Sequence, residues 1–417
     1  MLKPSFHKLN RENLSNSLAN NSVLFLQSKD VILKGDSEFF DFCDVNMFYL
    51  TGIEQAETKL LIYKNSKGES EDILFVQNKN NQLEMWNGAR LSSSQAKKIS
   101  GIKNVYYNSS FEEISQSYLS KAKILYYYED KSLDLKNKSE YILTYEKLKR
   151  KNKLKSENIY DLISSLRKIK TKDEIDEIRE AMKITRLTLI DIMKNLSKFK
   201  SEKGIEASLS YSYIGNNCNH SYQPIVASGI NACTLHYVKN NSQLKKGDLV
   251  LIDTGAEHNN YKTDITRTLP ISGRFSKRQK EIYESVLKVQ KQAIKMLKPS
   301  LNIYDWDRKV LDLMAKELIK LKLITKIQFE KDRKVVKKFY PHSIGHFLGL
   351  DTHDIGSYKL NPVFSEGIVF TVEPGIYVPK EKIGVRIEDN VLITKNGCEV
   401  LSKSIPKEVK EIERLFR

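Results

Sequence analysis

Residues 248–272 read DLVLIDTGAEHNNYKTDITRTLPIS. Apolar and polar residues alternate over residues 248–255 and again over residues 261–269, which is the pattern of a strand with one buried face. The residues between the two runs, 257–260, are of types that favour turns. This order predicts a β-hairpin that belongs to a buried sheet.

Two aspartates occupy matching places in the predicted hairpin. If its turn centres on His258 and Asn259, then Asp253 and Asp264 face each other directly, with Cβ atoms about 5 Å apart. Two buried carboxylates at that distance repel each other and cannot both stay ionised without a cation. Because an isolated pair of aspartates more often caps a turn or faces water, a metal site needs support from further residues.

Three further residues of metal-binding type stand in comparable settings. His346 lies in a loop punctuated by glycines, PHSIGHFLGLDTHD, rather than on one face of an amphipathic helix. Glu373 ends one apolar run just before a Pro-Gly turn, and Glu388 interrupts another apolar run. A carboxylate at such a place in a strand needs a partner or an ion. The sequence therefore predicts a site for two divalent cations, formed by Asp253, Asp264, His346, Glu373 and Glu388.

Four segments, in this order along the chain, resemble those of the pita-bread metallopeptidases and, within that family, the Xaa-Pro aminopeptidases. They are IDTGAEHNNYKTDITRT, PHSIGHFLGLDTHDIG, TVEPGIY and GVRIEDNVLIT. The resemblance covers nearly the whole chain and is strongest over residues 222–394. It implies a metallohydrolase that removes the first residue of peptides whose second residue is proline.

The same resemblance assigns roles to the predicted ligands. It implies that they hold two divalent metal ions, usually manganese, and an oxygen-rich ligand set with one imidazole suits Mn²⁺. Glu373 matches a glutamate that also moves a proton to the leaving proline nitrogen. The implied catalytic residues are Glu373, His236, His353 and Arg386.

Residues of a substrate pocket follow in the same way. His236 and His342 match pocket histidines, and His353 matches a histidine that hydrogen-bonds the substrate near the proline. Arg386 matches an arginine that orients the site. Without the motif, His236 would be an ordinary loop histidine and Arg386 an ordinary surface arginine. Two of the 21 tyrosines match residues near the substrate amine and the catalytic water. The implied substrate-binding residues are Tyr222, His236, His342, His353, Tyr377 and Trp86.

The pattern around the hairpin predicts a repeated architecture. A capping box at Thr171 opens a helix, a second helix follows Ser201, and the aspartate hairpin comes next. The order repeats with helices after Ser276 and from about Asn302, followed by the glutamate hairpin. Two α-α-β-β halves predict a pita-bread catalytic domain with a pseudo-twofold axis, in the α/β (α+β) class, over residues 169–417.

A smaller amino-terminal α/β domain is predicted over residues 1–168, where short β-like runs alternate with Lys-, Asn- and Ser-rich segments. Its segment QLEMWNGAR resembles one whose tryptophan reaches the active site of a neighbouring subunit. We therefore expect Trp86 either to line a neighbour's substrate pocket or to pack in the core, in a homo-oligomer that is a dimer or a tetramer. Residues 40–46 depart from the family pattern, so no contact is assigned to them. The β-like runs are residues 22–26, 59–63, 72–77 and 124–128.

The composition restricts the classes of partner. The 417 residues include 69 Lys and Arg against 52 Asp and Glu, a formal net charge of +17 that invites a nucleic-acid partner. However, the basic residues are spread along the chain, and the densest basic stretches, residues 148–155 and 331–338, contain no interleaved aromatic residues. We therefore expect a solvated basic surface and no nucleic-acid partner.

The cysteines and the apolar runs indicate a cellular compartment. The four cysteines show no C-x-x-C pairing, so neither a disulfide framework nor a zinc site is predicted, and a reducing compartment fits. No apolar run of about 18 residues occurs, and the first 25 residues lack the apolar region of a signal peptide. These features predict a soluble, cytoplasmic protein without a membrane partner. The cysteines are Cys43, Cys218, Cys233 and Cys398.

Two alternative functions stay open at this point. A prolidase would share the metal centre and cleave only Xaa-Pro dipeptides, but no arginine that would bind a dipeptide's carboxylate can be assigned from the sequence. A pita-bread domain can also be a binding module without activity, although such relatives usually lose metal ligands and this chain keeps five.

Overall fold

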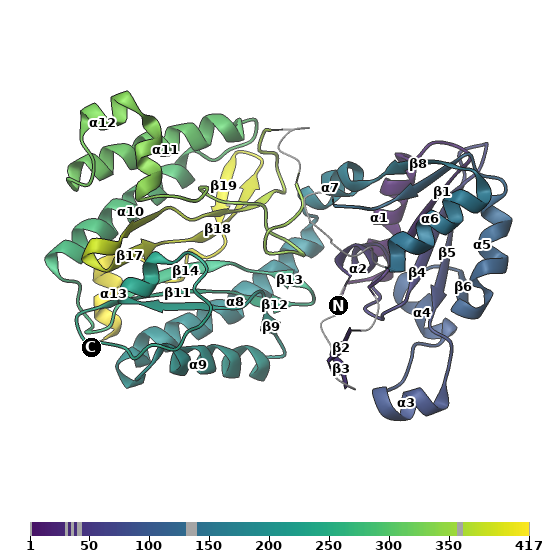
Figure 1. Cartoon of the computed structure of the whole chain (residues 1–417), viewed down its shortest axis with the longest axis horizontal. Helices are drawn as coiled ribbons and strands as arrows, with labels where there is room; N and C mark the ends of the chain where they lie inside the picture. Colours follow the sequence, from purple (N-terminus) through teal and green to yellow (C-terminus); the bar gives the residue numbers. More distant parts are fainter. Residues whose placement is uncertain are drawn as a thin grey trace. The chain divides into compact units, whose positions relative to one another are not determined.

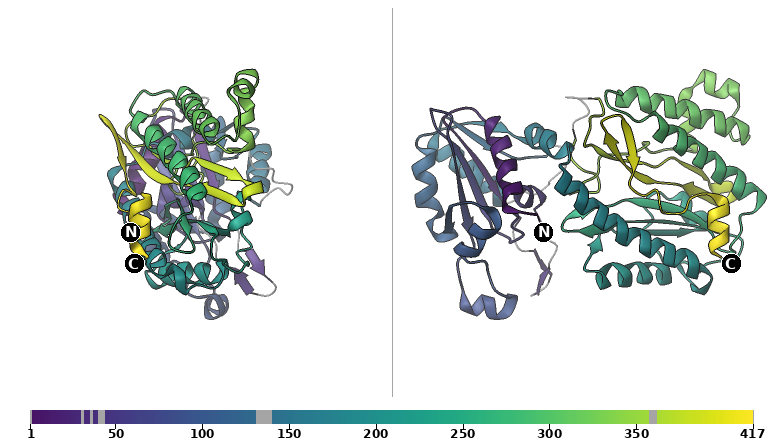
Figure 2. Two further views of the ribbon diagram at one scale, coloured as in Figure 1. Left: turned by 90° about the vertical axis from the view of Figure 1, so that its left-hand side faces the viewer. Right: turned by 180° about the vertical axis from the view of Figure 1, so that it is seen from behind.

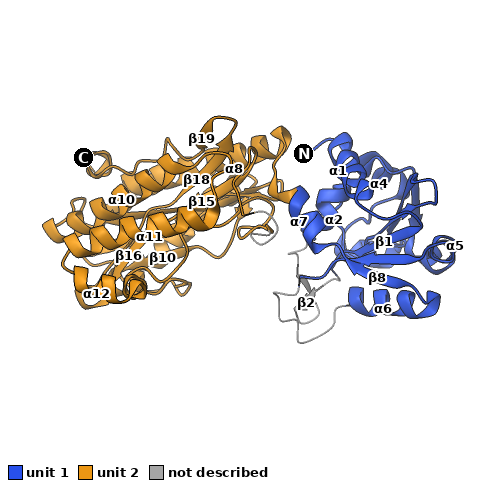
Figure 3. Ribbon diagram, turned by 90° about the horizontal axis from the view of Figure 1, so that it is seen from above, with its two compact units in different colours: residues 1–166 blue, residues 167–417 orange. Residues whose placement is uncertain are grey.

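The computed structural model describes residues 2–29, 32–34, 37–39, 44–130, 140–356 and 362–416. It contains two compact units, residues 1–166 and residues 167–417 (Figure 3). Most of the divergent loop over residues 40–46, including Cys43, lies outside the described residues.

One six-stranded sheet forms the centre of the first unit (Figure 1). Its strands are β1 (Ser22–Gln27), β4 (Lys59–Lys64), β5 (Ser70–Val76), β6 (Asn104–Tyr107), β7 (Ile124–Tyr127) and β8 (Lys155–Asn158). Their order is β6-β5-β4-β1-β7-β8, and a separate hairpin is formed by β2 (Ile32–Lys34) and β3 (Ser37–Phe39). The short β-like runs of the sequence correspond to β1, β4, β5 and β7.

The helices of the first unit are α1 (Pro4–Asn16), α2 (Val45–Thr51), α3 (Asn81–Asn87), α4 (Ser93–Ser100), α5 (Phe111–Leu119), α6 (Glu140–Asn152) and α7 (Tyr160–Lys168). α1 contacts β4, whereas α5 and α6 contact β1. All six residues of β1 are buried, which is typical of a strand whose sheet is covered on both faces.

Trp86 lies in α3 of the first unit, and 77% of its surface is exposed. None of the residues of α3 is buried. The expectation that Trp86 could pack as a core tryptophan is therefore wrong, because most of its surface is exposed in this chain.

The second unit repeats one arrangement twice. Its first half contains α8 (Lys172–Asn195), α9 (Glu202–Gly215), β9 (Asn219–His220), β10 (Ile225–Ser228), β11 (Leu249–Thr254), β12 (Ala256–His258), β13 (Tyr261–Lys262) and β14 (Ile265–Pro270). Its second half contains α10 (Lys277–Met296), α11 (Ile303–Lys320), α12 (Lys326–Lys331), β15 (Val369–Val372), β16 (Gly375–Val378), β17 (Ile383–Arg386), β18 (Asp389–Thr394), β19 (Gly397–Val400) and α13 (Val409–Leu415). In Figures 1 and 2 the strands run between α8 and α9 on one side and α10 and α11 on the other.

The four long helices begin where the sequence predicts. Thr171 and Ser276 accept hydrogen bonds from the third backbone N–H of α8 and α10 in complete capping boxes. Ser201 and Asn302 accept backbone N–H groups at the starts of α9 and α11. The apolar faces of these helices pack into one core that extends to the strands, and Trp306 is fully buried in it.

The turn of the aspartate hairpin is one residue later than predicted. His258 pairs with Tyr261, so the two turn residues are Asn259 and Asn260. Both have positive φ, at 46° and 68°, which a two-residue hairpin turn of this hand requires and which asparagine tolerates. The predicted centre on His258 and Asn259 is wrong because it includes only one of the two residues that adopt this conformation.

This shift changes the partners of the two aspartates. Asp253 lies opposite Thr266, and Thr254 lies opposite Ile265, so Asp264 immediately precedes β14. The prediction that the aspartates face each other directly is therefore wrong by two residues of register. At Gly255 a Cβ atom would lie 1.7 Å from the carbonyl oxygen of Thr263, so only glycine allows the strands to approach this closely.

Hydrogen bonds join the aspartate hairpin to the glutamate hairpin. Glu388 donates its backbone N–H to the carbonyl of Thr266 at 3.1 Å. The Asn390 side chain receives the backbone N–H of Asp264 at 3.1 Å and donates to the carbonyl of the same residue at 2.6 Å. These hydrogen bonds hold the two hairpins against each other around Asp264 and Glu388.

A buried ion pair lies directly behind this junction. The Arg267 guanidinium contacts Asp389 at 2.8 Å, and both side chains are fully buried. Arg267 also donates to the carbonyl oxygens of Glu388, Ile405 and Pro406.

Among the described residues, no helix is long and apolar enough to cross a membrane.

We expect Arg267→Ala to lower the free energy of unfolding by about 3 kcal/mol, because it removes one cationic partner of a buried carboxylate. Urea denaturation at neutral pH measures the change. Arg179→Ala is the control, since the side chains of Arg179 and Glu399 are nearly half exposed in their ion pair. This control should change the free energy by less than about 1 kcal/mol. Equal losses in the two variants would contradict the prediction.

Candidate metal centre

A cavity of about 450 Å³ opens where the two hairpins meet. The structure brings all five predicted metal ligands to it, together with four other predicted site residues. Its lining consists of Leu235, His236, Asp253, Asp264, His342, Ser343, Gly345, His346, His353, Glu373, Arg386 and Glu388.

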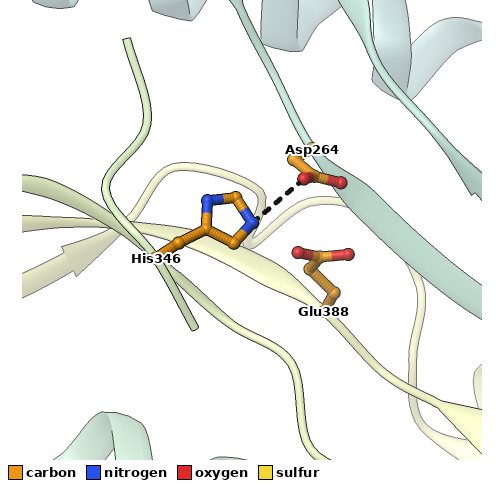
Figure 4. A group of neighbouring side chains, drawn as sticks. All are labelled: Asp264, His346 and Glu388. Atoms are coloured by element: carbon orange, nitrogen blue, oxygen red, sulfur yellow. Dashed lines mark ion pairs between the residues drawn. The ribbon is translucent and has the colours of Figure 1, made fainter. Parts of the chain in front are cut away.

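Three of these side chains form a compact group (Figure 4). One potential ligand atom from each of Asp264, His346 and Glu388 lies within 4.8 Å of the other two. His346 Nε2 is 3.4 Å from Asp264 Oδ2 and 3.5 Å from Glu373 Oε1. Ligand atoms about 2.1 Å from a common ion in octahedral geometry lie about 3 Å apart. The spacing therefore fits a divalent cation among these four residues.

The hydrogen bond at the other ring nitrogen determines the tautomer of His346. Nδ1 lies 3.0 Å from the carbonyl oxygen of Phe347, and a carbonyl oxygen can only accept. Nδ1 therefore holds the proton, and the lone pair of Nε2 points toward Asp264 and Glu373. Histidines that bind metals usually donate their second ring N–H in this way.

Glu388 provides a second test of whether a cation fits. Its Oε2 accepts from the hydroxyl of Thr266 at 2.7 Å, whereas its Oε1 is buried without a hydrogen-bond partner among the described residues. Burial, followed by the charges of Asp264 and Glu373, raises the pKa of Glu388 well above its ordinary value. An unpartnered buried carboxylate oxygen is costly, and a bound dication would satisfy it.

Asp253 and Asp264 share one hydroxyl group. Tyr222 donates toward a carboxylate oxygen of each, and its distance to Asp264 is 2.5 Å. Burial, then Asp253 and Glu373, raise the pKa of Asp264 well above its usual range. Because one phenol has only one proton, Tyr222 cannot satisfy both aspartates at once.

Arg386 begins a directed chain of hydrogen bonds along the cavity wall. It donates to Asp253 at 2.5 Å and to the Tyr377 hydroxyl at 2.9 Å. That hydroxyl lies 2.8 Å from Nε2 of His342, whose Nδ1 lies 2.8 Å from the carbonyl of Ser343. Burial, followed by the charge of Arg386, lowers the pKa of His342 to about 3. The neutral ring therefore donates through Nδ1 and accepts from Tyr377 through Nε2, which leaves no proton on Nε2.

Two further histidines line the cavity. His353 lies beside His346, with ring centroids 4.1 Å apart and ring planes tilted by 50°. Burial, then the neighbouring His346 and His236, lower the pKa of His353 to about 4, so its ring is neutral at pH 7. His236 is exposed and lies on the loop that follows β10. Trp86 belongs to the other unit, and its role in a neighbouring subunit stays a prediction.

The sequence analysis missed two threonines that hold the ligands. Thr266 donates to Glu388 and accepts from Arg386 Nε at 3.1 Å. Thr371 receives the backbone N–H of His346 at 3.0 Å and lies 3.4 Å from Glu373 Oε1. Thr266 is two residues from Asp264, and Thr371 is two residues from Glu373. Successive side chains of a strand point to opposite faces, so residues two apart lie on the same face. Examination of these positions in the sequence could have identified both.

We expect Asp264→Asn to weaken metal binding by at least roughly tenfold, because the substitution removes one charge from the compact ligand group. Thermal unfolding of chelated protein, repeated with increasing Mn²⁺, measures this. The midpoint should rise with Mn²⁺ in the unsubstituted protein and change far less in the variant. Glu317→Gln, a buried carboxylate that pairs with Lys288, is the control and should respond as the unsubstituted protein does. Equal rises in all three proteins would contradict the site.

Comparisons with known proteins agree with this geometry. Residues 176–395 match Metallopeptidase family M24, and residues 7–126 match Aminopeptidase P, N-terminal domain. The chain is 34% identical over 387 residues to an Xaa-Pro aminopeptidase of Haemophilus influenzae, which covers 89% of this chain and 88% of that relative.

Solved structures show the same architecture. A putative aminopeptidase P from Bacillus anthracis is 35% identical with a TM-score of 0.91, over 99% of this chain and 98% of that one. Aminopeptidase P from Escherichia coli with the inhibitor Pro-Leu is 27% identical with a TM-score of 0.91, over the same shares. The predicted fold, a pita-bread domain preceded by an amino-terminal domain, is confirmed. The chain therefore belongs to metallopeptidase family M24.

Proposed function

We propose that this protein is a metal-dependent aminopeptidase that hydrolyses the bond between an N-terminal residue and a penultimate proline. The observation that carries the proposal is the cavity of about 450 Å³, into which both hairpins bring their carboxylates beside four histidines and Arg386. Relatives named Xaa-Pro aminopeptidase support the choice of substrate. The inhibitor Pro-Leu of the Escherichia coli enzyme begins with proline, as a product of such a cleavage would.

Membership of family M24 implies a divalent metal. We propose two Mn²⁺ ions, held by the predicted ligand set, because four carboxylates would balance two dications and one imidazole suits this metal. When bound, such ions lower the pKa of a water molecule and polarise the scissile carbonyl. The ligands are Asp253, Asp264, His346, Glu373 and Glu388.

The protein's own groups would position the peptide and move the proton. Glu373 lies at the cavity surface, with Oε1 near Thr371 and Oε2 3.6 Å from Nδ1 of His342. It is our candidate to take a proton from the attacking water and deliver it to the proline nitrogen. A peptide bond to proline has no N–H, so the nitrogen must gain a proton before it leaves. His342 cannot supply this proton, because its only ring N–H donates a hydrogen bond to the carbonyl oxygen of Ser343.

The histidines at the cavity have a different task. His236 and His353 both line it, and neither is among the predicted metal ligands. We assign them to the main chain of the bound peptide, where a neutral imidazole can donate or accept a hydrogen bond. Tyr222 and Arg386 hold Asp253, so we assign them to the orientation of the metal ligands rather than to the peptide.

A panel of Xaa-Pro dipeptides and longer Xaa-Pro-Xaa peptides tests the function. We expect release of the first residue from the longer peptides, measured by mass spectrometry with Mn²⁺ present. Glu373→Gln, which keeps the shape of the side chain, should lower turnover by about 10²–10⁴-fold. Turnover of dipeptides alone would favour a prolidase, and turnover of none would overturn the proposal.

We also propose a homo-oligomer, a dimer or a tetramer, because Trp86 is exposed on α3 together with Met85. Sedimentation of the purified protein should then give a mass of at least twice 48.2 kDa, and a monomer would contradict this.

A cytoplasmic location is our further proposal, supported by the free thiols of Cys218, Cys233 and Cys398. The relatives include a mitochondrial peptidase of Arabidopsis thaliana, so localisation of a tagged chain must test it.

A further inference from the structure

The loop between β10 and β11 brings His236 and Leu235 to the cavity. It contains one 3-10 turn, Gly229–Cys233, and an isolated antiparallel bridge of Gln243 with Ser201, and residues 234–242 between them form neither helix nor strand. An irregular loop has no ladder of backbone hydrogen bonds to fix its shape. The position of His236 therefore depends on what holds the loop from outside.

One carboxylate binds this loop on both sides of His236. Glu202, the first residue of α9, is fully buried. Its Oε1 accepts from the backbone N–H of Ser228 at 2.7 Å, from the Ser228 hydroxyl at 2.7 Å and from Asn231 Nδ2 at 2.9 Å. Its Oε2 accepts from the Tyr237 hydroxyl at 2.9 Å and from the backbone N–H of Ser242 at 2.8 Å.

The pattern of these donors shows what Glu202 does. Ser228 and Asn231 precede His236 along the chain, whereas Tyr237 and Ser242 follow it, and each side of the loop bonds to a different oxygen of the carboxylate. Across the described residues, no Lys, Arg or His lies within ion-pair distance of Glu202. The loop itself therefore supplies all the donors that stabilise this buried charge.

We propose that Glu202 is a positioning residue for peptide binding, which fixes the loop that presents His236 to the substrate. This rests on the proposed function, because His236 is assigned there to the peptide main chain. Glu202 does not line the cavity, and its side chain accepts no hydrogen bond from a predicted metal ligand. Its effect should therefore reach substrate binding through His236 and leave the metal centre unchanged.

Glu202→Gln tests the proposal with a nearly isosteric side chain. An amide has one accepting oxygen and one donating nitrogen, so donors on one side of the loop lose their acceptor. Hydrogen exchange followed by mass spectrometry should show faster exchange over residues 229–241 in the variant. Exchange at an unchanged rate would overturn the proposal, whether or not the protein hydrolyses peptides.

The kinetic test uses the longer peptides of the panel. We expect Glu202→Gln to raise KM by about tenfold to a hundredfold with a smaller change in kcat, because the loop binds substrate and holds no metal ligand. Glu317→Gln, a buried carboxylate on α11, is the matched control and should leave KM unchanged. If the unsubstituted protein turns over the peptides and KM does not rise in Glu202→Gln, only the role of Glu202 fails.

A double-variant cycle distinguishes positioning from general destabilisation. If Glu202 acts through His236, then adding Glu202→Gln to His236→Ala should raise KM by less than about twofold further. If the rise in KM of the double variant equals the product of the rises in the two single variants, Glu202 acts elsewhere and the proposal is overturned. Tyr237→Phe replaces Glu202→Gln if that variant fails to fold. It removes one loop donor and keeps the Glu202 carboxylate, so it should raise KM by less than the tenfold to hundredfold expected for Glu202→Gln.

Discussion

Four largely buried carboxylates line one cavity, and the rest of the second unit is arranged around this electrostatic conflict. Burial raises the pKa of Asp264, Glu373 and Glu388, and the carboxylates add to one another's effect. Arg386 is the only permanently cationic side chain among the residues that line the cavity, and it contacts Asp253. One guanidinium cannot balance four carboxylates, so all four can be ionised together only with a bound cation.

The repeated α-α-β-β design provides the rigidity that such a site needs. Each hairpin contributes two carboxylates, one at the end of its first strand and one immediately before its last strand. Contacts between the hairpins, such as those of Thr266 with Glu388 and of Asn390 with Asp264, fix the distance between the ligands. The long helices lie outside the strands, so substitutions on their exposed faces should leave this distance unchanged.

Local rules predicted the elements, but pairing decided the register. The helix starts at Thr171, Ser201 and Ser276 follow from side-chain caps, which involve only residues close in sequence. The hairpin register depends on which two residues accept positive φ, and a run of four turn-favouring residues leaves several choices. The five predicted ligands nevertheless line one cavity, because a motif preserves residue types and order even where the register assigned to it is wrong.

The same comparison explains why Glu202 could not be found from the sequence while Glu388 could. Both are buried acids next to the end of a helix or strand, and neither has a cationic side chain in contact. Glu202 has donors on both oxygens, and they come from residues 26 to 40 positions later in the chain. Glu388 has one buried oxygen without a partner among the described residues. All the hydrogen-bonding capacity of Glu202 is directed at the loop, whereas Glu388 keeps an oxygen that a bound cation would satisfy. Only the folded arrangement distinguishes the two.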